Sequence, residues 1–321
     1  MPTLRSATIG AVVAIGAVAT TLVLVDRGTV PTPFDTSGCT AEVDGRTVEI
    51  DLEQAENASL ITAISISRGM PARAASIALA TAYQESKLYN IDYGDRDSVG
   101  LFQQRPSQGW GTVKELMDPV YATNAFYDAL AQVDGYETME ITVAAQEVQR
   151  SAYPEAYADH EADARALASA LTGNSPEAMW CDVPSDAGES SDELDPSGLV
   201  ARAAVVRADL ESRFGTLSLG GFEPAGVSTG HMEGSLHYSG RAIDVFVRPI
   251  NADNRKRGWA LATYLVANAD RLDLATVIFD DRIWQARRSA DGWRDYRVPS
   301  SSSGDRAILE HRDHVHVDVL D

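Results

Sequence analysis

The spacing of apolar residues divides the chain into segments of different character. An apolar run without any charge covers residues 7–25, and Asp26 and Arg27 follow it directly. As a helix this run would be roughly 28 Å long, about the thickness of the hydrocarbon core of a bilayer. It predicts either an uncleaved signal anchor or a cleaved signal peptide, and both place the rest of the chain outside the cytoplasm.

Two linkers, at residues 28–38 and 182–197, separate the segments that we expect to fold. Residues 182–197 are acidic, rich in Ser and Pro, and nearly without apolar side chains, so they cannot bury a core. We therefore expect five parts. They are an anchor or signal segment at 1–27, a linker at 28–38, a domain at 39–181, an acidic flexible linker at 182–197 and a second domain at 198–321.

Helical periodicity dominates the first domain. Small or apolar residues recur at intervals of three and four, which is typical of amphipathic helices. The predicted helices cover residues 72–85, 121–133, 142–151 and 155–171. Before them, residues 41–50 alternate around Asp44-Gly45, a pattern that favours a small β-hairpin.

The second domain mixes two periodicities. Helical spacing covers residues 199–214 and 257–269, whereas short runs rich in branched residues, at 242–247, 275–280 and 314–320, indicate strands. Such a mixture is typical of an α+β domain with a small antiparallel sheet. The predicted fold is thus multidomain: a transmembrane helix, a mainly α-helical domain and a C-terminal α+β domain.

Charge and cysteine content narrow the possible functions. The 321-residue chain has a net charge of −20, which argues against binding to nucleic acid or to an anionic membrane surface. The only cysteines, Cys39 and Cys181, bracket the first domain. Export permits a disulfide between them, and two buried free thiols are the alternative. Nothing in the composition indicates a protein partner.

Histidines are concentrated in the second domain, where five of the six fall between positions 231 and 316. His237 and Asp244 are seven residues apart with Gly240 between them, and His316 follows on a distant predicted strand. Histidine, aspartate and histidine form a three-ligand set for a hydrolytic zinc ion, which keeps its fourth position open. We expect one zinc ion per chain.

Hydrolysis at such a centre also requires a general base. Asp313 lies three residues before the last predicted ligand, and His314 shares a strand face with His316 because strand side chains alternate. Either side chain can supply the base, and His314 can instead bind the oxyanion that develops on the substrate. Both therefore remain candidate catalytic residues.

The segment from Ser235 to Asp244 matches the pattern Ser-x-His-x-x-Gly-x-Ala-x-Asp at every fixed position. It resembles the zinc peptidases of the D-alanyl-D-alanine carboxypeptidase group, which share a site design with lysostaphin-type and hedgehog-type domains. The resemblance implies that His237, Asp244 and His316 are the ligands and that Ser235 contacts either the ligand residues or the substrate. Phage endolysin relatives carry an Asp in the position of Asp313, and other relatives have a His-x-His that His314 and His316 match.

A second resemblance lies in the first domain. Glu85-Ser86 ends an Ala-rich predicted helix, and Gly-Leu-Phe-Gln follows at residues 100–103. These residues resemble the lysozyme-like domain of soluble lytic transglycosylases and goose-type lysozymes. The resemblance implies that Glu85 is the general acid and that Gln103 lines a sugar cleft. Tyr153 is the expected substrate-binding tyrosine, although Pro154 stands where that family usually has Asn.

Glu85 would have to be protonated to act as an acid at neutral pH. Apolar neighbours such as Leu88 and Leu101 would supply the raised pKa that this requires. Asp95 and Asp97 are candidates for a second carboxylate by proximity in sequence alone. Without a second carboxylate, a group of the substrate itself would complete the reaction.

The two resemblances together predict an exported enzyme, attached to the membrane by its N-terminal helix, that acts on peptidoglycan. The first domain would cut the glycan, and the second would be a zinc-dependent D,D-carboxypeptidase or endopeptidase that cuts stem peptides. One alternative is a wall-binding or scaffold protein with inactive domains. Another is an enzyme in which the zinc domain alone is active and the helical domain targets it.

Overall fold

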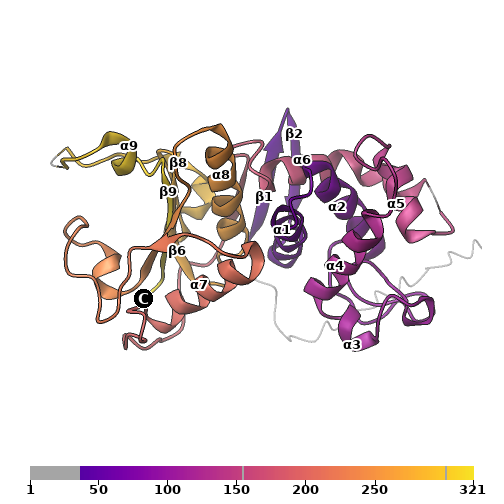
Figure 1. The fold of residues 1–321 in the computed structure, drawn as a ribbon, viewed down its shortest axis with the longest axis horizontal. Helices are drawn as coiled ribbons and strands as arrows, with labels where there is room; N and C mark the ends of the chain where they lie inside the picture. The colour runs from indigo at the N-terminus through magenta and orange to yellow at the C-terminus, as the bar shows by residue number, and fades with distance from the viewer. Residues whose placement is uncertain (1–36, 154, 301) are drawn as a thin grey trace, which may run out of the picture. The chain divides into compact units, whose positions relative to one another are not determined.

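The computed structural model describes residues 37–153, 155–300 and 302–321 (Figure 1). All of these residues belong to one compact unit. It contains a three-stranded and a six-stranded sheet, with helices between and around them.

The three-stranded sheet connects the two ends of the N-terminal part, residues 39–181. Its strands are antiparallel in the order β2-β1-β3, with β1 at Gly38–Val43, β2 at Arg46–Ile50 and β3 at Met179–Asp182. Asp44 and Gly45 turn the predicted hairpin with positive φ angles of 51° and 79°, which confirms it. Cys39 and Cys181 are paired across β1 and β3 and form a disulfide, so the predicted bridge is also confirmed.

The helices of the N-terminal part surround an Ala-rich core. Asp51 caps α1 through a capping box with Gln54, and α2 ends at Lys87, whose backbone is left-handed. The helices are α1 Leu52–Ser67, α2 Ala72–Ser86, η1 Pro106–Gln108, α3 Val113–Leu116, α4 Pro119–Leu130, α5 Ile141–Gln149, η2 Ala156–His160 and α6 Glu161–Leu171.

The C-terminal part, residues 198–321, is built on the six-stranded antiparallel sheet with strand order β4-β5-β9-β6-β7-β8. The strands are β4 Leu219–Gly220, β5 Ala242–Phe246, β6 Leu274–Phe279, β7 Arg282–Gln285, β8 Arg294–Asp295 and β9 His314–Val319. The helices are α7 Ala201–Phe214, η3 Leu236–Ser239, α8 Ala252–Ala267, η4 Ala286–Asp291 and α9 Arg306–Leu309.

One continuous hydrophobic core joins the two parts. Helix α8 packs against the β6 strand on one side and contacts α1 and α6 on the other. Polar contacts reinforce this packing: Asn268 Nδ2 donates to Ser59 Oγ at 2.8 Å, and Trp284 Nε1 donates to the Cys181 carbonyl at 3.0 Å. The segment at 183–200 contains no helix or strand, and the Asp192 carboxylate in it pairs with Arg241.

The predicted fold class requires a correction. We expected a transmembrane helix followed by a helical and an α+β domain, whereas residues 37–321 form a single α+β unit. No helix among the described residues combines the length and the apolar character needed to cross a bilayer. The predicted anchor at 1–27 lies outside the described residues. The prediction of a transmembrane helix relied on the hydrophobicity of residues 7–25 alone.

Candidate functional site

The three side chains of the predicted zinc set meet on one face of the paired strands β5 and β9. The antiparallel register pairs Asp244 directly with His316, and η3 brings His237 to the same face. His237 Nε2 lies 3.1 Å from His316 Nδ1 and 3.3 Å from Asp244 Oδ1, and His316 Nδ1 lies 3.2 Å from that oxygen. Ligands of a tetrahedral zinc ion with bonds of about 2.0–2.1 Å are separated by about 3.3–3.4 Å. The triangle therefore has the dimensions of a three-ligand zinc site.

The orientation of His237 depends on its close surroundings. Ser235 begins η3, and its hydroxyl accepts a hydrogen bond from the backbone N–H of His237. The imidazole Nδ1–H donates to the Gly221 carbonyl at 2.8 Å, which leaves Nε2 for the centre. Gly221 has a φ of +79°, and a Cβ there would lie 2.3 Å from the His237 ring. Position 221 therefore requires a glycine, because any side chain there would collide with the His237 ring.

His316 is held by a carboxylate that the sequence analysis did not identify. Its Nδ1 faces the centre, and its Nε2 lies 3.3 Å from Asp318 Oδ2. Asp318 is buried, and its other oxygen has no hydrogen-bond partner within the described part of the chain. Such an outer carboxylate fixes the tautomer and the orientation of a metal-binding histidine. His314, His316 and Asp318 alternate along β9 and so share one face of the strand. This spacing in the sequence could have indicated that Asp318 contacts His316.

The two candidate bases are arranged as a pair. Asp313 Oδ1 lies 2.7 Å from His314 Nδ1, and Arg248 Nε donates to Asp313 Oδ2 at 2.6 Å. Both carboxylate oxygens are therefore engaged. His314 Nε2 lies 3.7 Å from Asp244 Oδ1, at the edge of the ligand triangle. The geometry presents His314 to the centre and places Asp313 behind it.

Two more histidines surround the ligand set. The His231 ring stacks on His237 with centroids 3.9 Å apart, and a nitrogen of His231 comes within 4.8 Å of ligand atoms of His237 and Asp244. The His311 ring lies 5.6 Å from His316. Burial lowers the pKa of His311 to about 2, and the neighbouring His316 contributes to this shift, so the imidazole is neutral.

The electrostatics of the centre favour a bound cation. Burial opposes ionisation of Asp244, but hydrogen bonds to His237 and His316 hold its pKa below the usual range. Burial likewise opposes protonation of His316, and yet its pKa is raised to about 9 by the carboxylates of Asp244 and Asp318. Asp244 thus contributes a buried negative charge to the centre, and nitrogen and carboxylate donors suit zinc. The residues present fit that ion.

Glu85 lies in the last turn of α2 and is largely enclosed. Its Oε1 accepts a hydrogen bond from the Tyr157 hydroxyl at 2.7 Å and another from Gln149 Nε2 at 3.3 Å. Burial raises the pKa of Glu85, whereas the two hydrogen bonds partly oppose the shift. Next to it, Ser86 Oγ donates to the Leu101 carbonyl at 2.7 Å, which attaches the predicted Gly-Leu-Phe-Gln segment to α2.

The other predicted residues of this site are placed differently. Gln103 Nε2 donates hydrogen bonds to the backbone carbonyls of Tyr93 and Gly100. Tyr153 is 76% exposed, and it is Tyr157, four residues later, that contacts Glu85. Tyr157 was not predicted from the sequence, although an Ala-Tyr pair occurs at 156–157 as well as at 152–153.

The two candidates for a second carboxylate, Asp97 and Asp95, each face an arginine. The Asp97 carboxylate pairs with Arg105 at 2.9 Å and accepts from the backbone N–H of Ser107. The Arg105 and Ser107 bonds keep the pKa of Asp97 well below its usual range. Asp95 is exposed and faces Arg96.

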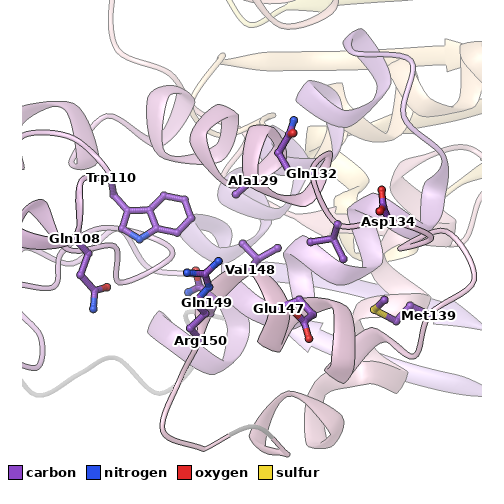
Figure 2. A pocket seen from close by; sticks show the side chains of 11 residues that line it. Gln108, Trp110, Ala129, Gln132, Asp134, Met139, Glu147, Val148, Gln149 and Arg150 are labelled. Atoms are coloured by element: carbon purple, nitrogen blue, oxygen red, sulfur yellow. The ribbon is translucent and has the colours of Figure 1, made fainter.

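A cleft of about 810 Å³ lies beside the Glu85 site. Gln149 lines this cleft and also donates to Glu85, whereas Glu85, Gln103 and Tyr157 are not among the lining residues. Figure 2 shows Trp110 and Gln108 on one side of Gln149, and Met139 and Asp134 on the other. An indole and several amides along an open cleft are groups that bind sugar rings and their hydroxyls.

Comparison with known proteins finds a similarity in the C-terminal part. Residues 196–306 match the model of a family described as VldE, C-terminal domain. The match covers about a third of the chain and includes His237 and Asp244, but it ends before Asp313, His314 and His316. No curated protein matches the chain.

Proposed function

We propose that the protein is an exported, peptidoglycan-remodelling hydrolase whose C-terminal part is a zinc-dependent peptidase. The observation that carries the proposal is the triangle of His237, Asp244 and His316, whose sides of 3.1–3.3 Å suit one zinc ion per chain. The Cys39–Cys181 disulfide supports a location outside the reducing cytoplasm.

A bound zinc ion would polarise the scissile carbonyl and lower the pKa of an attacking water. The protein would supply the proton transfers through His314. Its Nδ1–H donates to Asp313, so Nε2 is the free acceptor facing the centre. Asp313 then acts as a positioning residue, because it fixes the tautomer of His314 and stabilises the imidazolium that forms.

The N-terminal part would cut the glycan with Glu85 as general acid. Burial raises the pKa of this carboxyl, as required for a group that protonates a glycosidic oxygen near neutral pH. Tyr157 and Gln149 would orient it, and the adjoining cleft would bind the sugar chain. Both activities act on one polymer, peptidoglycan, which is the proposed partner.

Two single substitutions test the assignment. Purified wall is digested with zinc-loaded protein, and the released muropeptides are analysed by mass spectrometry. Glu85→Gln should abolish glycan cleavage and leave peptide cleavage intact, whereas His316→Ala should abolish peptide cleavage and reduce bound zinc from one ion per chain to less than about 0.1 in elemental analysis.

The same experiment separates the alternatives. If the wild-type protein with one bound zinc leaves glycan and peptide bonds intact, the protein binds wall without turnover and the hydrolase proposal fails. If peptide bonds alone are cut, the N-terminal part binds glycan and only the zinc site is active. Peptide cleavage by a preparation without metal would overturn the zinc assignment.

A further inference from the structure

His231 lies on the loop between β4 and η3, residues 221–235, and its side chain turns inward. The residues on either side, 228–230 and 232–234, are exposed, whereas His231 is half-buried. Gly230 permits this turn, because its φ of +94° is one that other residues rarely adopt. His231 consequently lines a cavity of about 530 Å³ together with the three proposed zinc ligands.

The His231 imidazole is close enough to the centre to reach a zinc ion. Its ring stacks on His237 with the centroids 3.9 Å apart and the planes inclined by 26°. One ring nitrogen of each of these histidines and a carboxylate oxygen of Asp244 lie within 4.8 Å of one another. Since ligands of a tetrahedral zinc ion are about 3.3–3.4 Å apart, the His231 nitrogen needs to approach by about 1.5 Å at most.

The backbone of His231 is fixed, whereas its ring has no hydrogen-bond partner. The Tyr238 hydroxyl accepts a hydrogen bond from the His231 N–H at 3.1 Å and donates one to the His231 carbonyl. Within the described part of the chain, no hydrogen bond engages either ring nitrogen. A half-buried imidazole beside the Asp244 carboxylate, with no other polar partner, is suited to bind a metal ion.

Few polar contacts attach this part of the loop to the rest of the protein. Besides the two bonds to Tyr238, Ser302 Oγ donates to Met232 Sδ at 3.3 Å. Among the described residues, no other hydrogen bond joins residues 227–234 to a residue outside the loop. The segment at 227–234 can therefore move outward with the loss of few bonds, and His231 would move with it.

We propose that His231 is a displaceable fourth ligand that closes the zinc centre in the absence of substrate. The inference rests on the zinc centre of the proposed function. His231 would complete a set of four protein ligands, as in structural zinc sites, whereas catalysis requires the fourth position to be open. A substrate would thus have to displace the 227–234 segment before the centre can act.

Metal binding tests the ligand without turnover. His231→Ala should bind zinc at least about tenfold more weakly than the wild type in competition with a chromogenic chelator, because the ion loses a nitrogen donor. Co²⁺ serves as a coloured probe in place of zinc, and its visible spectrum should differ between the variant and the wild type. Added imidazole should restore the wild-type spectrum to the variant, since it supplies the missing donor.

Acetohydroxamate, a small chelator, tests whether the fourth position is closed. It should bind zinc-loaded His231→Ala about tenfold more tightly than the wild type, where it has to displace an imidazole. Peptide release from purified wall by the zinc-saturated variant should be faster than release by the wild type for the same reason.

Two further variants make the test specific. Tyr238→Phe keeps the His231 side chain but removes both bonds to its backbone, so zinc affinity should fall by less than in His231→Ala. Met232→Ala is the matched control, because Met232 is on the same loop, lines the same cavity and is 44% exposed. This variant should bind zinc and acetohydroxamate as the wild type does.

The results separate this inference from the proposed function. If the wild type binds neither zinc nor Co²⁺, the zinc centre itself fails. If the wild type binds one zinc ion and His231→Ala matches it in zinc affinity and Co²⁺ spectrum, the centre stands and the role of His231 is overturned. If the variant binds zinc more weakly but both proteins bind acetohydroxamate equally, His231 stabilises the metal without closing the centre, and the proposed closure is overturned.

Discussion

At the scale of single residues, the proposed zinc site depends on more side chains than its three proposed ligands. His237, Asp244 and His316 could be predicted because their types and order are characteristic of zinc hydrolases. Asp318 and Gly221 could not, since their roles arise from contacts across the fold. Asp318 reaches His316 along β9, and the Gly221 carbonyl reaches His237 from a strand end 16 residues earlier.

Asp318 provides a test at this scale. Asp318→Asn should lower zinc affinity by about 10- to 100-fold, because the amide is a weaker acceptor for His316 Nε2–H and leaves the tautomer less well fixed. Competition with a chromogenic chelator measures the affinity. Asp253→Asn, an exposed change in the first turn of α8, is the control and should leave it unchanged. Equal zinc affinities for the Asp318→Asn variant and the wild type would contradict the role given to Asp318.

Glu85 gives a prediction about stability and pH. A carboxyl with a raised pKa in the folded state binds its proton more tightly there than in the unfolded chain, so it stabilises the fold at acidic pH and loses that contribution as pH rises through the folded pKa. Burial is the cause of the shift. Glu85→Gln cannot ionise and should therefore be more stable than the wild type at pH 7.5, with the advantage lost at pH 4.

Urea unfolding at the two pH values measures this difference. The amide introduced by Glu85→Gln keeps an oxygen that can accept from Tyr157, so the comparison isolates ionisation from the loss of a hydrogen bond. Glu189→Gln, at an exposed position outside the helices and strands, should follow the wild type at both pH values. If Glu85→Gln made the protein less stable than the wild type at pH 7.5, ionised Glu85 would carry no burial cost.

At the scale of elements, periodicity identified helices and strands that bury one face. It placed α2, α7, β5, β6 and β9 within a few residues of their observed bounds. Helix α1 was missed because residues 58–65 are buried without interruption, and such a helix has no polar stripe to define a period. The stretch predicted as a single helix at 155–171 is divided into η2 and α6.

Glu85 on α2 contacts Tyr157 on η2, and a contact between two distant elements is difficult to predict from the sequence. Glu85 was recognisable from its place at the end of an Ala-rich helix, but its hydroxyl partner comes from η2, which is 72 residues away. Two Ala-Tyr pairs in succession offered equal local patterns, and Tyr153 was the one predicted. Only the packing of η2 against α2 selects Tyr157, and no local pattern encodes that contact.

At the scale of the whole molecule, the sheets and the core connect the regions that carry the two sites. The Trp284 indole donates to the carbonyl of the disulfide residue Cys181, and Trp293 Nε1 donates to the Met179 carbonyl at 2.9 Å. Strand β3 is therefore both the last strand of the N-terminal sheet and a support for the C-terminal part. The hydrophobic pattern could not predict this arrangement, because it marks residues as buried without identifying what covers them.

The Cys39–Cys181 disulfide closes a loop with a sequence separation of 142 residues. In the chain-entropy model a loop of that length stabilises the folded state by up to about 5 kcal/mol, since the reduced unfolded chain gains the freedom that the bridge removes. The double variant Cys39→Ser/Cys181→Ser should have a lower urea midpoint, and its free energy of unfolding should fall by up to about 5 kcal/mol. Because β3 supports both parts, the loss should appear as one transition in tryptophan fluorescence and in zinc release. If zinc release kept its wild-type midpoint while the N-terminal part unfolded earlier, the two parts would be separate cooperative units joined only by the chain.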